Sequence, residues 1–271
     1  MSDVDIDLVI VNYRTPRLLM ALLESLVNFE PDCSFSVTVI DVDPVNASSS
    51  FIDVRSSRSS LSPLPSFSYI SIPENIGYAR ACNLGAAATN GRNIALLNAD
   101  TRFNNAYCID RCVKFLDSNS LVGVVGPLQI DGGRSRAVTH GGIFGSLSKP
   151  IERAFKSINK KGLMEDAKAV SVSGSALFTK RSVWNEMHDC EIFLESFPDA
   201  IGSFILTQHF YEETGYNYHV QSHGYEVWYL GSAEMIHEWH KSSPPGTQSK
   251  HIEKSRSIFR DFCDAHGIDR P

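Results

Sequence analysis

The sequence lacks the features of a small disulfide-stabilised domain. Its six cysteines are scattered over 271 residues without a C-x-x-C pair, and a chain of this length can build a core without covalent cross-links. We therefore expect free thiols. Cys108 and Cys112 lie four residues apart on a predicted helix, where they are expected to share a packing face. A metal clip at this pair would lack partners at ligand spacing.

Positive charge and long apolar runs are also scarce. The net charge is −6 and the pI is near 5.8, which gives no electrostatic footprint for a nucleic-acid backbone or an anionic membrane and favours small or neutral partners. No run reaches the roughly 18 apolar residues of a transmembrane helix, and residues 1–7 have neither the basic nor the apolar region of a signal peptide. These absences predict a soluble, cytoplasmic protein with no transmembrane segment.

Short apolar runs alternate with helical patterns along the chain. Residues 8–11 and 94–97 are continuous apolar runs, as expected of strands buried on both faces. Thr15 and Pro16 suit the N-cap and first position of a helix whose leucines recur at helical spacing to about residue 29. The alternation predicts an α/β fold with a mostly parallel central sheet flanked by helices. Further strands are expected at 35–40, 68–72, 121–126, 170–178 and 227–230, and further helices at 78–89, 105–117, 180–187, 210–223 and 249–266.

Two segments have a composition that forms no regular element. Residues 45–68 are rich in serine and proline and are expected to be a loop. Residues 131–166 combine glycines with seven lysines and arginines, which indicates a solvated basic segment or, alternatively, a flap near an anionic ligand. The pattern of residues 193–210 favours neither helix nor strand.

Acidic side chains follow two of the predicted strands. Asp41 and Asp43 come at the end of one strand, and Asp100 follows the run Ile94 to Leu97. Ligands of open α/β sheets bind beyond the carboxyl ends of the strands. Buried acids there need compensation, which a divalent cation with a diphosphate would provide. Each acid alone is equally compatible with an ordinary turn.

Taken together, the motifs resemble those of family 2 glycosyltransferases with the GT-A fold, in particular rhamnosyltransferase-like and galactofuranosyltransferase-like members. The resemblance covers roughly residues 6–243 and keeps the family's order throughout. It implies a single GT-A domain over residues 1–271: a nucleotide-sugar-binding half to about residue 100, an acceptor-binding half over about 101–246, and a C-terminal packing helix over 247–271. The motifs are Val9 to Tyr13, Asp41, Glu74 to Tyr78 with Asn83, Leu96 to Thr101, Val172 to Leu177, Glu212-Glu213, and Gly231 to His237.

The resemblance assigns a metal site to Asp100 and His237. Asp100 matches the last acid of the family's D-x-D-type motif, while Asn98 stands where many members have the first acid. An imidazole beside a single carboxylate suits Mn²⁺ better than Mg²⁺. A lone histidine beside Trp239 and His240 would otherwise be interpreted as a packing residue.

The nucleotide end of the site is assigned to Asp41, which matches the acid that accepts a hydrogen bond from a uracil or thymine N–H. The chain continues with Val42-Asp43-Pro44 and departs from the family here, so Asp43 is a second candidate for this role. By resemblance, Asn12, Tyr13 and Asn75 line the same pocket. Without the resemblance, Asp41 and Asp43 would simply begin a turn.

Catalysis is assigned to the acidic pair Glu212-Glu213, with Glu213 as the base. Gly215 replaces a further acid of the family motif, and a solvated pair at a helix start is the alternative interpretation. The implied reaction is an inverting displacement from a UDP- or dTDP-sugar, rather than a GDP-sugar, onto an acceptor hydroxyl. The acceptor is left open among a glycan, a lipid-linked glycan, a small molecule, a protein and a modified nucleic acid.

Two other functions compete with this interpretation. A sugar nucleotidyltransferase of similar fold would need a Gly-rich, basic phosphate loop after the first strand, where Asn12 to Pro16 stands instead. A non-catalytic nucleotide-sugar-binding module would have kept the pocket and lost the base, and the altered acidic motif is its best support.

Overall fold

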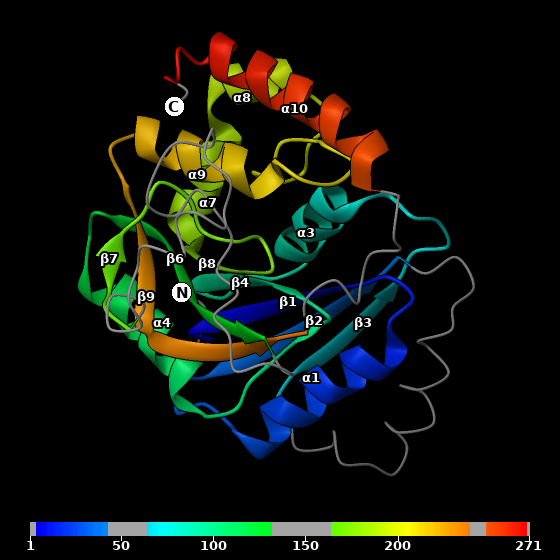
Figure 1. The fold of residues 1–271 in the computed structure, drawn as a ribbon, viewed down its shortest axis with the longest axis vertical. Helices are drawn as coiled ribbons and strands as arrows, with labels where there is room; N and C mark the ends of the chain where they lie inside the picture. Colours follow the sequence, from blue (N-terminus) through cyan, green and yellow to red (C-terminus); the bar gives the residue numbers. More distant parts are fainter. Residues whose placement is uncertain (1–3, 43–63, 132–163, 239–247, 270–271) are drawn as a thin grey trace.

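The computed structural model describes residues 4–42, 64–131, 164–238 and 248–269. Within these ranges the chain forms one nine-stranded sheet between helical layers (Figure 1). The strands are β1 (Ile6–Asn12), β2 (Phe35–Asp41), β3 (Phe67–Ser71), β4 (Asn93–Asn98), β5 (Thr101–Arg102), β6 (Val122–Asp131), β7 (Ala167–Lys168), β8 (Ala176–Lys180) and β9 (Glu226–His237). The helices are α1 (Pro16–Asn28), α3 (Tyr78–Ala87), α4 (Tyr107–Ser118), α7 (Arg181–Asp189), α8 (Glu191–Ser196), α9 (Glu212–Ser222) and α10 (Gln248–Ala265).

The sheet has the order β3-β2-β1-β4-β8-β6-β9-β5, with β7 paired to β9. Strands β3, β2, β1 and β4 are parallel, and so are β6 and β9, whereas β8, β5 and β7 pair antiparallel with their neighbours. The predicted α/β architecture, a central sheet flanked by helices, is confirmed.

Apolar runs in the central strands are continuous because both faces of the sheet are covered. Successive side chains of a strand point to opposite faces. Leu8 and Ile10 accordingly pack with α1 and α4, while Val9 and Val11 pack with α3, α7 and α9. Of the leucines predicted for one face of α1, Leu18 is only partly buried. The other four, Leu19, Leu22, Leu23 and Leu26, are buried in the first of these two layers.

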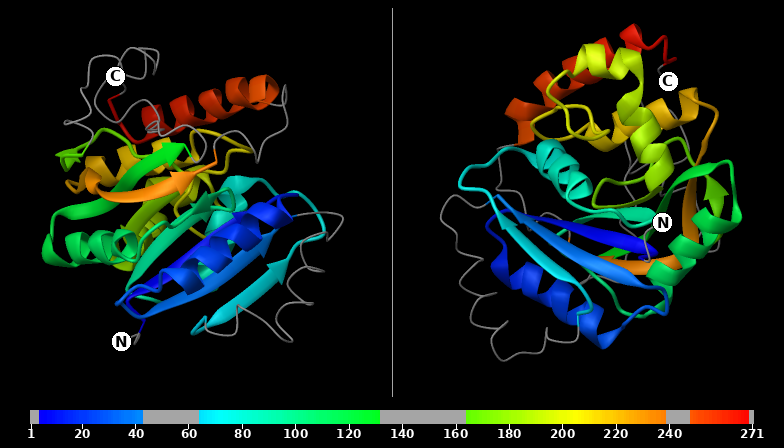
Figure 2. Two further views of the ribbon diagram at one scale, coloured as in Figure 1. Left: turned by 60° about the horizontal axis from the view of Figure 1, so that its bottom comes forward. Right: turned by 180° about the vertical axis from the view of Figure 1, so that it is seen from behind.

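A third apolar cluster lies outside the sheet layers, between α8, α9 and α10. Phe259, Phe262 and Cys263 of α10 pack there against Phe193 of α8 and Tyr218 of α9. Figure 2 shows α10, in red, on the side of α9 that faces away from the sheet. The C-terminal helix is therefore held by apolar packing, as its helical pattern predicted. Among the described helices none combines the length and the apolarity needed to cross a membrane.

Several local predictions were correct only in part. Only the end of the 170–178 segment is a strand, because β8 begins at Ala176, and the strand predicted at 227–230 continues as β9 to His237. Thr15 occupies the N-cap of α1, but its hydroxyl donates to Asn12 Oδ1 instead of capping the helix. The predicted loop at 45–68 and the basic segment at 131–166 lie largely outside the described residues.

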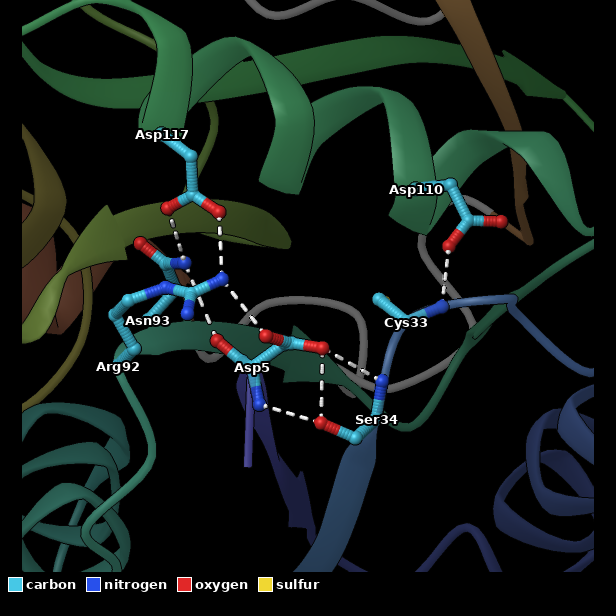
Figure 3. A network of polar contacts seen from close by, with 7 residues as sticks. All are labelled: Asp5, Cys33, Ser34, Arg92, Asn93, Asp110 and Asp117. Atoms are coloured by element: carbon cyan, nitrogen blue, oxygen red, sulfur yellow. Dashed lines mark hydrogen bonds and ion pairs between the residues drawn. The ribbon is translucent and has the colours of Figure 1, made fainter. Parts of the chain in front are cut away.

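The amino ends of the parallel strands are joined by a polar network (Figure 3). The Arg92 guanidinium lies 2.7 Å from Asp5 Oδ1 and 2.8 Å from Asp117 Oδ2, and the Asp5 carboxylate also accepts from the backbone and hydroxyl of Ser34. The Arg92 side chain is 56% exposed, so these ion pairs contribute little to stability. The network therefore lies at the amino ends of β1, β2 and β4, whereas the acidic motifs lie at the carboxyl ends of these strands.

Candidate active site

The carboxyl ends of β1, β2 and β4 meet at one edge of the sheet. Parallel pairing sets Asn12 beside Asp41 and Val11 beside Asn98. Because these strands run in the same direction, polar residues that end them in sequence are brought together in space. The predicted donor-site residues Asn12, Asp41 and Asn98 therefore share this edge, and Asp100 follows β4 by two residues.

Asp41 is fully buried at this edge and is held by two neighbouring side chains. Asn12 Nδ2 donates to its Oδ1 at 3.0 Å, and the Tyr69 hydroxyl of β3 donates to its Oδ2. Each carboxylate oxygen can accept more than one hydrogen bond. The carboxylate is thus oriented and can still accept a further N–H. Tyr69 was not predicted, since a tyrosine in a short strand is an ordinary strand residue in sequence.

Two of the remaining predicted donor-site residues have different surroundings. Tyr13 is partly exposed, and the Arg14 guanidinium carbon lies 5.2 Å from its ring centre. Asn75 is exposed, and its Oδ1 accepts from the Gly77 backbone at 3.0 Å, which forms the turn into α3. Asp43 lies outside the described residues.

Asp100 and His237 are brought together by a strand pairing of only two residue pairs. Antiparallel β5 and β9 pair Thr101 with His237, and the Glu238 backbone donates to the Asp100 carbonyl at 2.8 Å. His237 Nε2 consequently lies 3.4 Å from Asp100 Oδ1, with the residues 3% and 1% exposed. A carboxylate oxygen and an imidazole nitrogen at this separation are a donor set that fits a divalent transition metal.

The acidic pair begins α9 after two strained residues. Phe210 and Tyr211 both have φ of 69°, in the left-handed region that non-glycine residues rarely adopt. Glu212 is buried, and its Oε2 accepts from the Thr207 hydroxyl at 2.8 Å. Glu213 is partly exposed, but its Oε2 is buried and has no hydrogen-bond partner among the described residues.

The environment of this pair favours protonation. Burial, and then the neighbouring Glu213 carboxylate, raise the pKa of Glu212 to about 8, and burial also raises the pKa of Glu213. A carboxylate with a raised pKa is a stronger base than an ordinary glutamate. The pair can therefore take up a proton close to neutral pH.

The segment Ser173 to Ser175 contacts both the end of β4 and Glu213 of α9. The Asn98 backbone donates to the Ser175 carbonyl at 2.9 Å. At Gly174 an added Cβ would lie 3.1 Å from Glu213 Cβ, so the glycine permits the close approach of α9. The Tyr78 hydroxyl donates to the Gly174 carbonyl at 2.5 Å. The end of β4 and the start of α9 are thus linked through this segment, and the contact made by Tyr78 was not predicted.

Asn83 fixes the loop that leads to the acidic pair. Its side-chain amide exchanges two hydrogen bonds, both of 3.0 Å, with the backbone of Phe204. Ile205, next in the loop, packs against Gly215 of α9, where an added Cβ would lie 2.7 Å from Ile205 Cδ1. Close packing against Ile205 therefore explains why Gly215 stands where the family motif has an acid.

Comparison with solved structures identifies proteins that have a similar fold. The chain superposes on GalNAc-T7, crystallised with UDP, GalNAc and Mn²⁺, with a TM-score of 0.61 and 13% identity over 98% of this chain and 55% of that chain. It superposes on the mannosyltransferase PcManGT from Pyrobaculum calidifontis, in complex with GDP-Man and Mn²⁺, with a TM-score of 0.60 and 12% identity over 98% of this chain and 69% of that chain. A third similar structure is S. aureus TarS 1-349, with a TM-score of 0.54 and 12% identity over 96% of this chain and 71% of that chain.

These likenesses, at 12–13% identity, show the fold alone, and the chain spans about half the length of the first of the three. A search of curated proteins found no match. The sequence model of glycosyl transferase family 2 matches residues 7–185, which is more than half of the chain. The match confirms the predicted family and leaves the rhamnosyltransferase-like and galactofuranosyltransferase-like specificity a prediction. With its sheet edge, its acidic pair and this match, the chain belongs to glycosyl transferase family 2 and has the GT-A fold.

Proposed function

We propose that the chain is an inverting glycosyltransferase that moves a sugar from a UDP- or dTDP-sugar to an acceptor hydroxyl. The observation that carries the proposal is the contact of buried Asp100 with buried His237, 3.4 Å apart, at the sheet edge that also holds Asp41. A buried carboxylate oxygen and an imidazole nitrogen side by side at the carboxyl end of a sheet are a donor set that suits a divalent cation, and this cation would in turn bind a diphosphate.

The proposed donor site divides into two ends. Asp100 and His237 would hold the divalent metal, with Mn²⁺ favoured over Mg²⁺ by the nitrogen ligand. When bound, this metal would neutralise the charge of the departing diphosphate. Asp41, oriented by Asn12 and Tyr69, would accept the N–H of the uracil or thymine ring. GalNAc-T7 was crystallised with Mn²⁺ and PcManGT is in complex with Mn²⁺, which supports the proposed metal.

Glu213 is proposed as the base. Its carboxylate would take the proton of the acceptor hydroxyl while that oxygen bonds to the anomeric carbon and the bond to the diphosphate breaks. A single displacement of this kind inverts the anomeric centre. The buried Oε2 of Glu213 and its position against Gly174 support this role, because the base must lie beside the donor.

A thermal-shift screen of nucleotide sugars with and without Mn²⁺ tests the proposal, since a ligand that binds the folded state raises the apparent melting temperature. We expect UDP- or dTDP-sugars to raise it only with Mn²⁺, and His237→Ala to abolish the metal-dependent part. His251→Ala is the matched control, because His251 lies on α10. No shift with any nucleotide sugar would contradict the donor site.

Product assays with the same purified protein distinguish the transferase from the two competing functions. With Mn²⁺, the enzyme should release sugar slowly from its donor even without an acceptor, and mass spectrometry detects both products. Nucleotide-sugar binding without hydrolysis or transfer would favour a non-catalytic binding module. Consumption of a nucleoside triphosphate with a sugar 1-phosphate would indicate a nucleotidyltransferase.

A further inference from the structure

A second group of metal-binding side chains lies away from the donor site. Cys190 is the residue between α7 and α8, His219 lies in the last turns of α9, and His266 directly follows α10. The Sγ of Cys190 and one ring nitrogen of each histidine all lie within 4.8 Å of one another. Three elements that are distant in sequence thus direct a thiol and two imidazoles to one point.

The hydrogen bonding of these histidines is incomplete. His219 is fully buried, and neither of its ring nitrogens has a hydrogen-bond partner in the part of the chain that the structure describes. Nε2 of His266 is also buried without a partner. An imidazole always carries a donor or an acceptor at each nitrogen, and buried polar groups of native proteins are nearly always paired. The bare nitrogens therefore indicate a partner other than the described residues, and a bound ion would supply it at one nitrogen of each histidine.

The surrounding residues fix the His219 ring without bonding to its nitrogens. Phe193 stacks on the ring with centroids 5.8 Å apart and an interplanar angle of 12°, and Phe262 meets it edge-on at 5.4 Å. Cys190 is a free thiol. An apolar wall around convergent sulfur and nitrogen atoms is the setting of a structural metal site.

We propose that Cys190, His219 and His266 bind a Zn²⁺ ion that fastens the C-terminal helix to α9. Thiolate and imidazole are ligands that zinc prefers, whereas the oxygen-bearing donor site suits Mn²⁺. A tetrahedral zinc site has ligand atoms about 3.4–3.8 Å apart, so the three side chains need to close by about 1 Å. Binding would release the proton of the Cys190 thiol to solvent, and a water molecule would fill the fourth position.

The ion would act at the end of α9 that lies opposite the acidic pair. His219 is in the same helix as Glu212 and Glu213, and α10 packs on α8 and α9 through the Phe262 cluster. Zinc would therefore hold three elements that the apolar cluster also joins. This role is independent of the proposed transferase activity.

Cobalt substitution tests the site directly. The protein, prepared without zinc, is titrated with Co²⁺, whose bond to a thiolate gives a near-ultraviolet charge-transfer band, and then with Zn²⁺ to displace it. We expect one Co²⁺ per chain with this band. Cys190→Ser should abolish the band, and His266→Ala should weaken zinc binding by more than about 100-fold, because even outer-shell partners of a metal contribute about 10–100-fold.

The controls separate this site from others. Cys190 and His266 are both partly exposed, so their variants are expected to fold, which circular dichroism checks. Cys33→Ser and His251→Ala remove the same residue types elsewhere and should keep the band, as should His237→Ala in the donor site. No thiolate band in the wild type, or an equal band in Cys190→Ser, would overturn the proposal. Loss of sugar transfer alone would not affect it.

Discussion

Glu213 combines a buried, unpaired carboxylate oxygen with a raised pKa, both of which suit a general base. Glu213→Gln keeps the shape of the side chain but cannot accept the proton. We expect transfer to fall by about 10²–10⁴-fold, the usual contribution of a general base, while donor affinity is unchanged. Steady-state kinetics with donor-binding titrations measure both quantities. Glu191→Gln, an acid in the first turn of α8, is the control, and full activity of Glu213→Gln would rule out this residue as the base.

Glu212 gives the stability of the protein a pH dependence. Its pKa is raised from 4.5 to about 8 in the folded state by burial and by Glu213. Between these values the unfolded chain has released the proton and the folded chain holds it, so stability decreases as the pH rises. Glu212→Gln should remove this loss and stabilise the protein more at pH 8 than at pH 5, by at least about 1 kcal/mol, the value of roughly one pKa unit. Urea unfolding at the two pH values measures the difference, and an equal effect at both would contradict the shift.

At the scale of elements, α9 is shaped by the loop against which it packs. An added Cβ at Gly215 would lie 2.7 Å from Ile205 Cδ1. Gly215→Ala should therefore destabilise the protein by about 1–3 kcal/mol through overpacking, although alanine is the better helix former. In an Ile205→Val background the crowding methyl group is absent, and the same substitution should become neutral or stabilising. A double-mutant cycle by denaturant unfolding tests this, and additive effects would contradict the packing account.

Elements whose own sequence pattern signals burial were predictable, and those that depend on particular distant side chains were not. The apolar runs of β1 and β4 and the leucine spacing of α1 reveal burial without knowledge of the partner. The approach to α9 shows no such pattern. Its loop is fixed by Asn83, 121 residues away from Phe204 in sequence, so residues 193–210 gave an ambiguous signal. Likewise, β5 has two residues and is a strand only because β9 pairs with it.

The candidate site was predictable where a motif stands at a strand end. Asp41 and Asp100 were found in this way, whereas the association of Asp100 with His237 came from the family resemblance and follows physically from the β5 to β9 pairing. Tyr69 and Tyr78 reach the site through their hydroxyl groups. Their sequence neighbourhoods are ordinary, because only tertiary structure decides where a tyrosine hydroxyl points.

At the scale of the whole molecule, Arg181 of α7 fastens the second half of the fold to the first. Its guanidinium lies 2.9 Å from Asp7 in β1, which is 2% exposed, and it also donates to the carbonyls of Gly91 and Ala86. Arg181→Ala removes the ion-pair partner of Asp7 and leaves this carboxylate buried. We expect the substitution to lower the free energy of unfolding by about 3–5 kcal/mol. Arg92→Ala, which removes an exposed arginine, should cost less than about 1 kcal/mol. Guanidinium unfolding measures both, and similar values for the two variants would contradict this role of Arg181.

The fold is proposed to assemble a metal-dependent nucleotide site on Asp100 and His237, and we would test this site by Mn²⁺ titration followed by electron paramagnetic resonance. The signal of free Mn²⁺ decreases as the ion binds. With UDP or dTDP present, the wild-type chain is expected to bind one Mn²⁺, Asp100→Ala to lose this binding, and Glu213→Gln to retain it. Mn²⁺ binding that neither nucleotide enhances, or that is equally strong in Asp100→Ala, would contradict the account.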